Sequence, residues 1–329
     1  MQILSLSIVE MTLIFTQVAR TGKILCMESK PYSREDCVCA IGVFDGVHLG
    51  HQALLRATLE DAAERRALPV VVTFDRDPDE LFCPERVHKL LTNEERLDRL
   101  QEIIPQVLDL HFTRELASLA WQEFLEHLLA LLPGFKAIHV GTNFHCGAKA
   151  AGGIKEITSW GSERNINVVV EPLLLHEEAP VSSSRIRALL AEGAVKKASE
   201  LLTRPFTLTG RVVTGAGRGH SLGFATANVE VDGRSAMLGP FVYAAYALLN
   251  GERHKAAVSI GEPPTFSHEA REFNPFFFEA HLIDFDGSLY GQELTLEFID
   301  RLRPMQRFES QDELIATVRD NINWVRENL

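Results

Sequence analysis

The sequence lacks the short motifs by which phosphate-binding and metal-binding proteins are most easily identified. It contains no G-x-x-x-x-G-K-[ST] loop and no set of protein-kinase motifs. Its five cysteines include no C-x-x-C pair, and their odd number is typical of reduced thiols in a cytoplasmic protein. We therefore interpret Cys37 and Cys39 as one face of a strand rather than as metal ligands.

Basic residues are too few to give the protein a positive field. The chain has 33 Lys and Arg residues against 45 Asp and Glu residues, for a net charge of -12. This balance predicts no nucleic-acid partner and no anionic membrane surface as a partner, and an anionic substrate would need local compensation.

A long hydrophobic run that could span a bilayer is also missing. The apolar stretch Met1 to Phe15 is interrupted by Glu10, has no basic segment before it and is too short to cross a membrane. We expect residues 1–35 to be an N-terminal extension that is partly disordered.

The length of 329 residues, with 46% apolar and 24% charged residues, is enough for two domains with real cores. In the first, residues 36–202, apolar β-branched segments alternate with helical patterns, which predicts a doubly wound parallel sheet. The predicted strands are Asp36–Phe44, Leu68–Phe74, Lys136–Val140 and Asn167–Val170, and the predicted helices include Gln52–Arg66 and Asn93–Ile104. The buried stripe of the first helix should consist of Leu54, Leu55, Thr58, Leu59, Ala62 and Ala63.

In the second domain, residues 203–329, short strands separated by Gly, Asn or Pro follow a helix at Val195–Leu202. This pattern is typical of a small antiparallel β-barrel. The predicted strands are Phe206–Thr214, Phe241–Leu249, His254–Ile260, Phe276–Asp284 and Glu293–Leu302. An apolar stripe formed by Leu314, Val318, Ile322 and Val325 predicts a C-terminal helix on the barrel, with Trp324 packing rather than catalysing. The expected fold class is thus α/β plus β.

The string GVFDGVHLGHQALLRAT joins the first strand to the first helix. In doubly wound sheets, ligands bind at the carboxyl ends of strands, where this turn lies. His48 and His51 stand one turn apart at a helix N-terminus, which already favours a phosphate, and we expect both imidazoles to donate toward that anion. Such a site can stabilise the charge that develops on an α-phosphate during nucleotidyl transfer. As an alternative, both histidines are helix-cap and surface residues; a zinc site lacks an obvious third ligand.

This string resembles the G-x-F-D-G-x-H-x-G-H signature of the bacterial bifunctional riboflavin kinase/FAD synthetase family. The matching residues are Gly42, Phe44, Asp45, Gly46, His48, Gly50 and His51. Further matches are LLTNEERLDRL from Leu90, GTNFHCG from Gly141 and VSSSRIR from Val181. The resemblance implies a Rossmann-like nucleotidyltransferase domain in which His48 and His51 are catalytic and the other signature residues bind nucleotide or phosphate.

By the same resemblance, Asn143 contacts nucleotide or phosphate. Ser183, Arg185 and Arg187 would bind the ATP phosphates at the start of a helix, where a serine cap and arginine forks suit an anion. The alternative for this segment is an ordinary capped helix, with Ser182 to Ser184 as its cap.

Two strings in the second domain resemble the kinase half of the family, GRVVTGAGRGHSLGFATANVEV and EAHLIDFDGSLYG. The resemblance implies that Thr226 and Asn228 contact Mg²⁺ and phosphate, and that Glu279 is the catalytic base. The glycine-rich loop could wrap phosphates with its backbone N–H groups, and its candidate nucleotide-binding residues are Gly215, Arg218 and Gly219. As alternatives, Thr226 and Asn228 form a turn, Glu279 is a solvated strand residue and the loop is a mobile hairpin.

Positions in three segments depart from the family pattern. Asp77 stands where T-F-x-P-H-P has its histidine, Ala225 replaces the proline of P-T-A-N, and Ser259 and Pro263 replace the first and fifth residues of N-I-G-x-R-P-T-F. Losing proline loosens the loop backbone, and losing arginine removes a possible anion contact.

The resemblance implies an enzyme with two activities. The barrel would phosphorylate riboflavin with ATP and Mg²⁺ to give FMN, and the first domain would transfer an adenylyl group from ATP to FMN, giving FAD and pyrophosphate. Two alternatives remain open: an FMN adenylyltransferase whose altered barrel only binds flavin, and a noncatalytic flavin-binding regulator. The sequence gives no indication of the oligomeric state.

Overall fold

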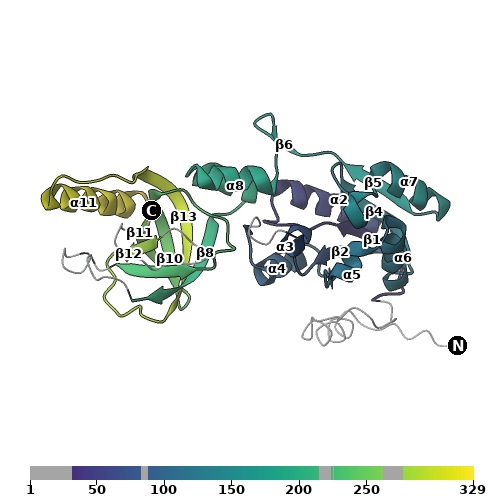
Figure 1. Ribbon diagram of the computed structural model, residues 1–329, viewed down its shortest axis with the longest axis horizontal. Coiled ribbons are helices and arrows are strands. Elements are labelled where there is room, and N and C mark those ends of the chain that lie inside the picture. The colour runs from purple at the N-terminus through teal and green to yellow at the C-terminus, as the bar shows by residue number, and fades with distance from the viewer. Residues whose placement is uncertain (1–31, 83–87, 215–223, 225, 262–276) are drawn as a thin grey trace.

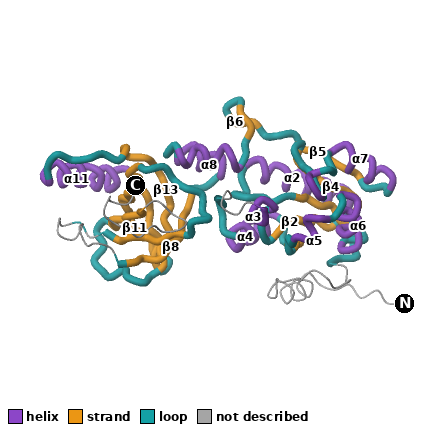
Figure 2. The backbone as a smooth tube through the Cα atoms, in the orientation of Figure 1, coloured by secondary structure: helices purple, strands orange, loops and turns teal. Residues whose placement is uncertain are grey.

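The computed structural model describes residues 32–82, 88–214, 224, 226–261 and 277–329. Two lobes lie side by side along the long axis of the molecule, with helix α8 (Ser183–Ala191) between them (Figure 1). One lobe is a sheet surrounded by helices, and the other is a barrel of strands with a long helix beside it (Figure 2).

The first lobe contains a five-stranded parallel sheet in the order β3-β2-β1-β4-β5. The strands are β1 (Cys37–Ile41), β2 (Leu68–Phe74), β3 (Val107–Leu110), β4 (Phe135–Gly141) and β5 (Asn167–Glu171). The expected doubly wound parallel sheet is therefore confirmed. Strand β3 was not expected, because its VLDL segment is only four residues long, includes the charged Asp109 and gives little periodicity.

Helices cover both faces of this sheet. Helices α2 (Leu49–Arg65) and α4 (Asn93–Ile103) pack on one face through Leu55 and Leu100. Helices α6 (Trp121–Leu131) and α7 (Ile154–Glu163) pack on the other face. The shorter elements of this lobe are α3 (Pro78–Phe82), α5 (Arg114–Ser118), the 3₁₀ turn Ala148–Ala150 and the hairpin β6 (Leu175–His176) and β7 (Ala179–Pro180).

Two details of the expected core can be checked directly. Cys37 and Cys39 lie buried on the same face of β1 with their sulfurs 3.9 Å apart and no disulfide, so their interpretation as one strand face is confirmed. Along α2, Leu54, Leu55, Thr58 and Ala62 are buried as predicted. Ala63 was wrongly included in the buried stripe, because it lies at the exposed edge of that face.

The second lobe is a closed antiparallel barrel in the order β10-β11-β12-β9-β8-β13. Its strands are β8 (Phe206–Val213), β9 (Ala227–Val231), β10 (Phe241–Leu249), β11 (Glu252–Gly261), β12 (Phe277–Leu282) and β13 (Glu293–Pro304). The predicted barrel is confirmed, but β9 was missed. Its ANVEV segment alternates buried and less buried residues over only five positions, directly after a glycine-rich string.

Three helices among the described residues complete the second lobe. The C-terminal helix α11 (Gln311–Asn328) packs on the barrel through Ile322 and Val325, and Trp324 joins this contact as predicted. Helix α8 and helix α9 (Val195–Leu202) share one hydrophobic core with the barrel, which includes Leu202 and Phe206. The barrel and the helices that precede it are thus packed as one unit.

We expect Leu55→Ala to lower the free energy of unfolding by about 2–5 kcal/mol, because it removes a fully buried side chain between α2 and the sheet. Leu173→Ala makes the same chemical change at a position that is 43% exposed and should cost less than about 0.5 kcal/mol. Urea unfolding of both variants measures the difference. Equal losses would contradict the core described above.

Candidate active sites

The turn between β1 and α2 has an unusual backbone. Phe44, Gly46 and Val47 all have positive φ angles, of 57°, 83° and 42°. Glycine suits this conformation at position 46, where a Cβ atom would also lie 2.8 Å from Leu90 Cδ1. Non-glycine residues with positive φ are strained and persist only where their surroundings fix them. The signature turn, residues 42–50, is therefore held in shape by its neighbours.

The two signature histidines form one stacked unit at the start of α2. His48 is the N-cap residue, and its Nδ1 accepts a hydrogen bond from the backbone N–H of His51 at 3.3 Å. The two rings stack with their centroids 3.6 Å apart. His48 Nδ1 is thus used as an acceptor, and the other ring nitrogen of His48 is the one left to donate toward an anion. The proton of a neutral His48 must then sit on Nε2.

Burial keeps both rings neutral. His48 is 4% exposed, and this burial lowers its pKa to about 4. Burial also holds the pKa of His51 well below its usual value, with a smaller contribution from His48. Within the described structure, His51 Nδ1 is buried without a hydrogen-bond partner. Neutral imidazoles can donate hydrogen bonds to a phosphate, but they bring no full charge.

Asp45 connects the signature turn to two distant segments. Its carboxylate accepts hydrogen bonds from the backbone N–H of Leu90 at 2.9 Å and from Arg187 Nη1 at 2.7 Å. Burial raises the pKa of Asp45, and the Arg187 charge acts against that rise. Ser183 Oγ donates to the Asp45 carbonyl at 2.8 Å. The structure therefore brings the predicted residues Ser183 and Arg187 to the signature turn.

Arg185 lies at the same helix start but has different partners. Its Nη1 donates to the carbonyls of His176 at 3.0 Å and Ala179 at 2.9 Å, so it holds the β6–β7 hairpin. Ser182, rather than Ser183, caps α8 by accepting from the Arg185 N–H. The phosphate contact of Arg185 stays a prediction.

The remaining predicted residues of the first domain lie around the same sheet edge. Asn143 is exposed and follows β4, which pairs with β1, so both strands end on the same side. Gly50 lies against the His48 ring, where a Cβ would stand 3.3 Å from the imidazole, and Gly42 lies against the Phe44 ring in the same way, at 3.2 Å. Larger residues would push these rings.

Arg96 was not identified as a site residue from the sequence. It is 3% exposed, and it donates to Thr73 Oγ1 at 2.8 Å and to the carbonyls of Val43 and Phe74. These contacts tie together the carboxyl ends of β1 and β2. Its position in the sequence could have indicated this role, because Arg96 is a charged residue one turn before Leu100 on the apolar face of α4.

Asp77, the departure from the family pattern, lies close to the signature turn. A small cavity of about 10 Å³, room for about one water molecule, is lined by polar and apolar side chains. The lining residues are Val43, Asp45, Asp77, Lys89, Leu91, Asn93 and Arg96. Asp77 therefore adds negative charge beside Asp45.

The three predicted residues of the barrel site meet in space. Glu279 on β12 is the register partner of Asn228 on β9. Thr226 Oγ1 donates to Glu279 Oε1 at 3.0 Å. A carboxylate, a hydroxyl and an amide thus lie together at one side of the β9–β12 pair. Gly215, Arg218, Gly219, Ala225 and Pro263 lie outside the described residues.

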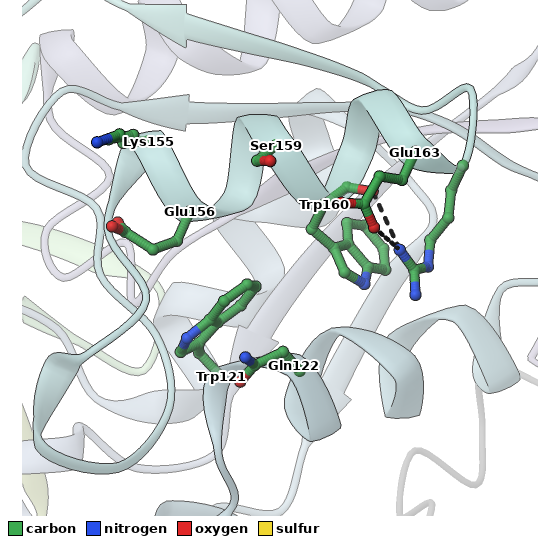
Figure 3. A pocket seen from close by; sticks show the side chains of 8 residues that line it. Trp121, Gln122, Lys155, Glu156, Ser159, Trp160 and Glu163 are labelled. Atoms are coloured by element: carbon green, nitrogen blue, oxygen red, sulfur yellow. Dashed lines mark hydrogen bonds and ion pairs between the residues drawn. The ribbon is translucent and has the colours of Figure 1, made fainter.

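A pocket of about 420 Å³ opens between α6 and α7, away from both predicted sites (Figure 3). Of its charged lining residues, Arg164 pairs with Glu163 at 3.3 Å and with the nearby Glu126 at 2.8 Å. Trp160 Nε1 donates to Glu126 at 3.0 Å. Because Arg164 and Trp160 already have these partners, we assign no ligand to this pocket.

Two features are absent from the described residues. No cluster of three or more His, Cys, Asp or Glu side chains in that part of the chain could hold a metal ion. None of the helices in those residues has the length and apolar composition needed to cross a membrane.

The first domain is a parallel sheet with a histidine-capped helix after its first strand, and the second is a barrel with a Thr-Asn-Glu cluster. The chain is thus a two-domain protein with two separate candidate sites. Residues 30–185 match the family model of FAD synthetase, and residues 202–329 match that of riboflavin kinase. The chain therefore belongs to the bifunctional riboflavin kinase/FMN adenylyltransferase family, as its motifs predicted.

Relatives of the same name are similar over most of their length. The bifunctional riboflavin kinase/FMN adenylyltransferase of Pseudomonas fluorescens is 33% identical, over 88% of this chain and 92% of that protein. The one of Escherichia coli K12 is 34% identical, over 87% and 90%. A crystal structure titled macrolide-efflux protein from Streptococcus pneumoniae superposes with a TM-score of 0.79 at 28% identity, covering 90% of this chain and 95% of that one.

The burial of His48 predicts a pH dependence of stability. Its pKa is about 4 in the folded protein and about 6.5 ordinarily, so between these values the unfolded chain binds the proton more readily. The free energy of unfolding should therefore fall as the pH drops from about 6.5 to about 4. His48→Asn keeps an N-cap acceptor but cannot titrate, so its fall should be shallower. Urea unfolding across this window compares the two slopes, and identical slopes would contradict a buried neutral His48.

Proposed function

We propose that this chain makes FAD from riboflavin in two ATP-dependent steps, each carried by one of the two sites described above. The barrel phosphorylates riboflavin to FMN, and the sheet domain transfers an adenylyl group from ATP to FMN. The observation that supports this assignment best is that the Thr226, Asn228 and Glu279 side chains meet in the barrel while the His48 turn is intact in the sheet domain. Each of the two activities in the relatives' name thus has a candidate site on this chain.

In the adenylyl transfer, an FMN phosphate oxygen attacks the α-phosphorus of ATP and pyrophosphate leaves. No protein nucleophile is needed, so the site acts by positioning and by stabilising charge. His48 Nε2 and the free N–H groups of the first turn of α2 donate to the α-phosphate as its charge grows. Arg187, aligned by Asp45, offsets the remaining negative charge together with Arg185.

Asn143, Ser183 and the signature glycines complete this proposed site. Ser183 stands within 2.8 Å of the turn carbonyl, and Asn143 lies at the end of the neighbouring strand. Their roles are contacts to the nucleotide and its phosphates.

In the kinase step, Glu279 takes the proton of the ribityl 5′-hydroxyl, whose oxygen attacks the γ-phosphorus of ATP while ADP leaves. Thr226 donates to Glu279 and so holds this carboxylate in place. The hydroxyl of Thr226 and the amide oxygen of Asn228 are hard ligands that fit Mg²⁺, which usually takes few protein ligands and several phosphate oxygens. When bound, Mg²⁺ neutralises charge on the transferring phosphate.

A cytoplasmic location is part of the same proposal. Cys37, Cys39 and Cys146 are buried free thiols, as expected for a reducing compartment. Riboflavin, FMN and ATP are the proposed partners.

Chromatographic separation of flavins tests the function directly. Purified protein with riboflavin, ATP and Mg²⁺ should form FMN and then FAD, and the same protein with FMN and ATP should form FAD and release pyrophosphate. FAD from FMN alone would restrict the function to adenylyl transfer. Flavin binding without turnover in either assay would leave only the noncatalytic regulator.

Substitutions should separate the two sites. We expect Glu279→Gln to lower the riboflavin kinase rate by about 10² or more, because the base is lost, and to leave FAD formation from FMN unchanged. His48→Ala should do the reverse, with a fall in kcat of about 10² and a much smaller change in the KM for ATP.

The control for His48→Ala is His48→Asn, which restores an N-cap acceptor but not the imidazole. If His48→Asn regained wild-type adenylyl transfer, the role of His48 would be structural capping alone. Equal losses of kcat and ATP affinity would also contradict the proposed role.

A further inference from the structure

Every carbonyl oxygen of the strained turn at residues 44–47 has a hydrogen-bond donor. The Phe44 carbonyl accepts from the Val47 N–H at 3.0 Å, within the turn itself. The Asp45 carbonyl accepts from Ser183 at 2.8 Å. The Gly46 carbonyl accepts from Arg204, at the junction of α9 with β8, and the Val47 carbonyl accepts from Gln52 on α2.

Arg204 lies between α9 and β8, at the start of the riboflavin kinase match at residues 202–329. Its Nη2 donates to the Gly46 carbonyl at 3.0 Å, and its Nη1 donates to the Leu202 carbonyl at 2.9 Å. A guanidinium has its N–H groups in a rigid plane, so these two bonds fix the position of Gly46 relative to the end of α9. A lysine could satisfy one carbonyl but could not set this geometry.

The neighbouring residue supports the same contact. Thr203 Oγ1 accepts from Gln52 Nε2 at 2.9 Å, and the same Nε2 donates to the Val47 carbonyl at 3.0 Å. Leu202 Cδ2 lies 3.3 Å from the position of a Cβ on Gly46. The α9–β8 junction thus packs directly on the backbone that leads into the N-cap residue His48.

We propose that Arg204 is a positioning residue for adenylyl transfer: through the Gly46 carbonyl it fixes the strained turn and so aims His48 at the α-phosphate. The proposal rests on the adenylyl transfer proposed above. Arg204 thus lies at the start of the kinase domain but acts in adenylyl transfer, the reaction of the other domain. The Arg204 guanidinium acts on a strained backbone next to the reacting atoms. A small displacement of His48 should therefore lower the rate of adenylyl transfer rather than weaken substrate binding.

The test uses the full chain with Arg204→Ala and Arg204→Lys. We expect kcat for FAD formation from FMN to fall by about tenfold to a hundredfold in both variants, with a change in the KM for ATP below about threefold. Riboflavin kinase activity should stay near the wild-type rate. Added guanidinium ion should restore part of the rate to Arg204→Ala and none to Arg204→Lys, whose ammonium fills the space.

Arg301→Ala is the matched control. Arg301 Nη1 also donates to a backbone carbonyl at the end of a helix, that of Glu192 after α8 at 2.9 Å, but it does not contact the signature turn. It should keep wild-type adenylyl transfer.

Three results would overturn the inference: unchanged adenylyl transfer in Arg204→Ala, equal loss of both activities in step with a lowered Tm, or no difference between Arg204→Ala and Arg301→Ala. If the wild-type protein itself formed no FAD from FMN, the proposed function would fail and the inference with it. If the wild-type protein forms FAD from FMN and Arg204→Ala does so at the same rate, the inference fails while the proposed function stands.

Discussion

The largely buried carboxylate of Asp45, 13% exposed, is the constraint on which the first site depends. It accepts from Arg187 on α8 and from the backbone of Leu90, so it joins three segments that are far apart in the sequence. Removing a charge from water is costly, and only partners at hydrogen-bond distance offset that cost. The fold therefore has to bring α8 and the Leu90 segment to this carboxylate, and in doing so it shapes the turn that leads to His48.

The state of the histidines follows from this packing. Once the turn is closed by its neighbours, the His48 and His51 rings are stacked and screened from water, and burial favours their neutral forms. A hydrogen bond donated from a buried neutral ring is stronger than the same bond in water, because the local dielectric is low. Positive charge for a phosphate must then come from arginines, and Arg187 and Arg185 stand at the adjacent start of α8. Burial thus decides that the histidines act as neutral hydrogen-bond donors and that the arginines supply the positive charge.

Periodicity and motif spacing predicted much of this protein, but not the partners of long polar side chains. The strand, turn and helix from Cys37 to Arg65 have strong local patterns, so their types were predicted from the sequence. Strand β9 was not, because five residues next to a glycine-rich string give no clear period, and its pairing with β12 forms only in the closed barrel. The hairpin contacts of Arg185 and the buried position of Arg96 depend on carbonyls that only the tertiary fold brings near. The acceptor role of His48 Nδ1 likewise depends on a rotamer that the sequence does not specify.

The two sites share a continuous framework as well as a chain. Strand β9, which carries Asn228, ends in a turn whose Arg234 carbonyl accepts from the Lys89 N–H, and the Ala236 N–H donates to the Lys89 carbonyl. The next residue, Leu90, donates to Asp45 and packs in the hydrophobic core shared by the barrel, α8 and α9. A dense core transmits displacements rather than absorbing them. The barrel strand that bears one site therefore supports the segment that holds the other, and the signature turn is shaped by both halves of the protein.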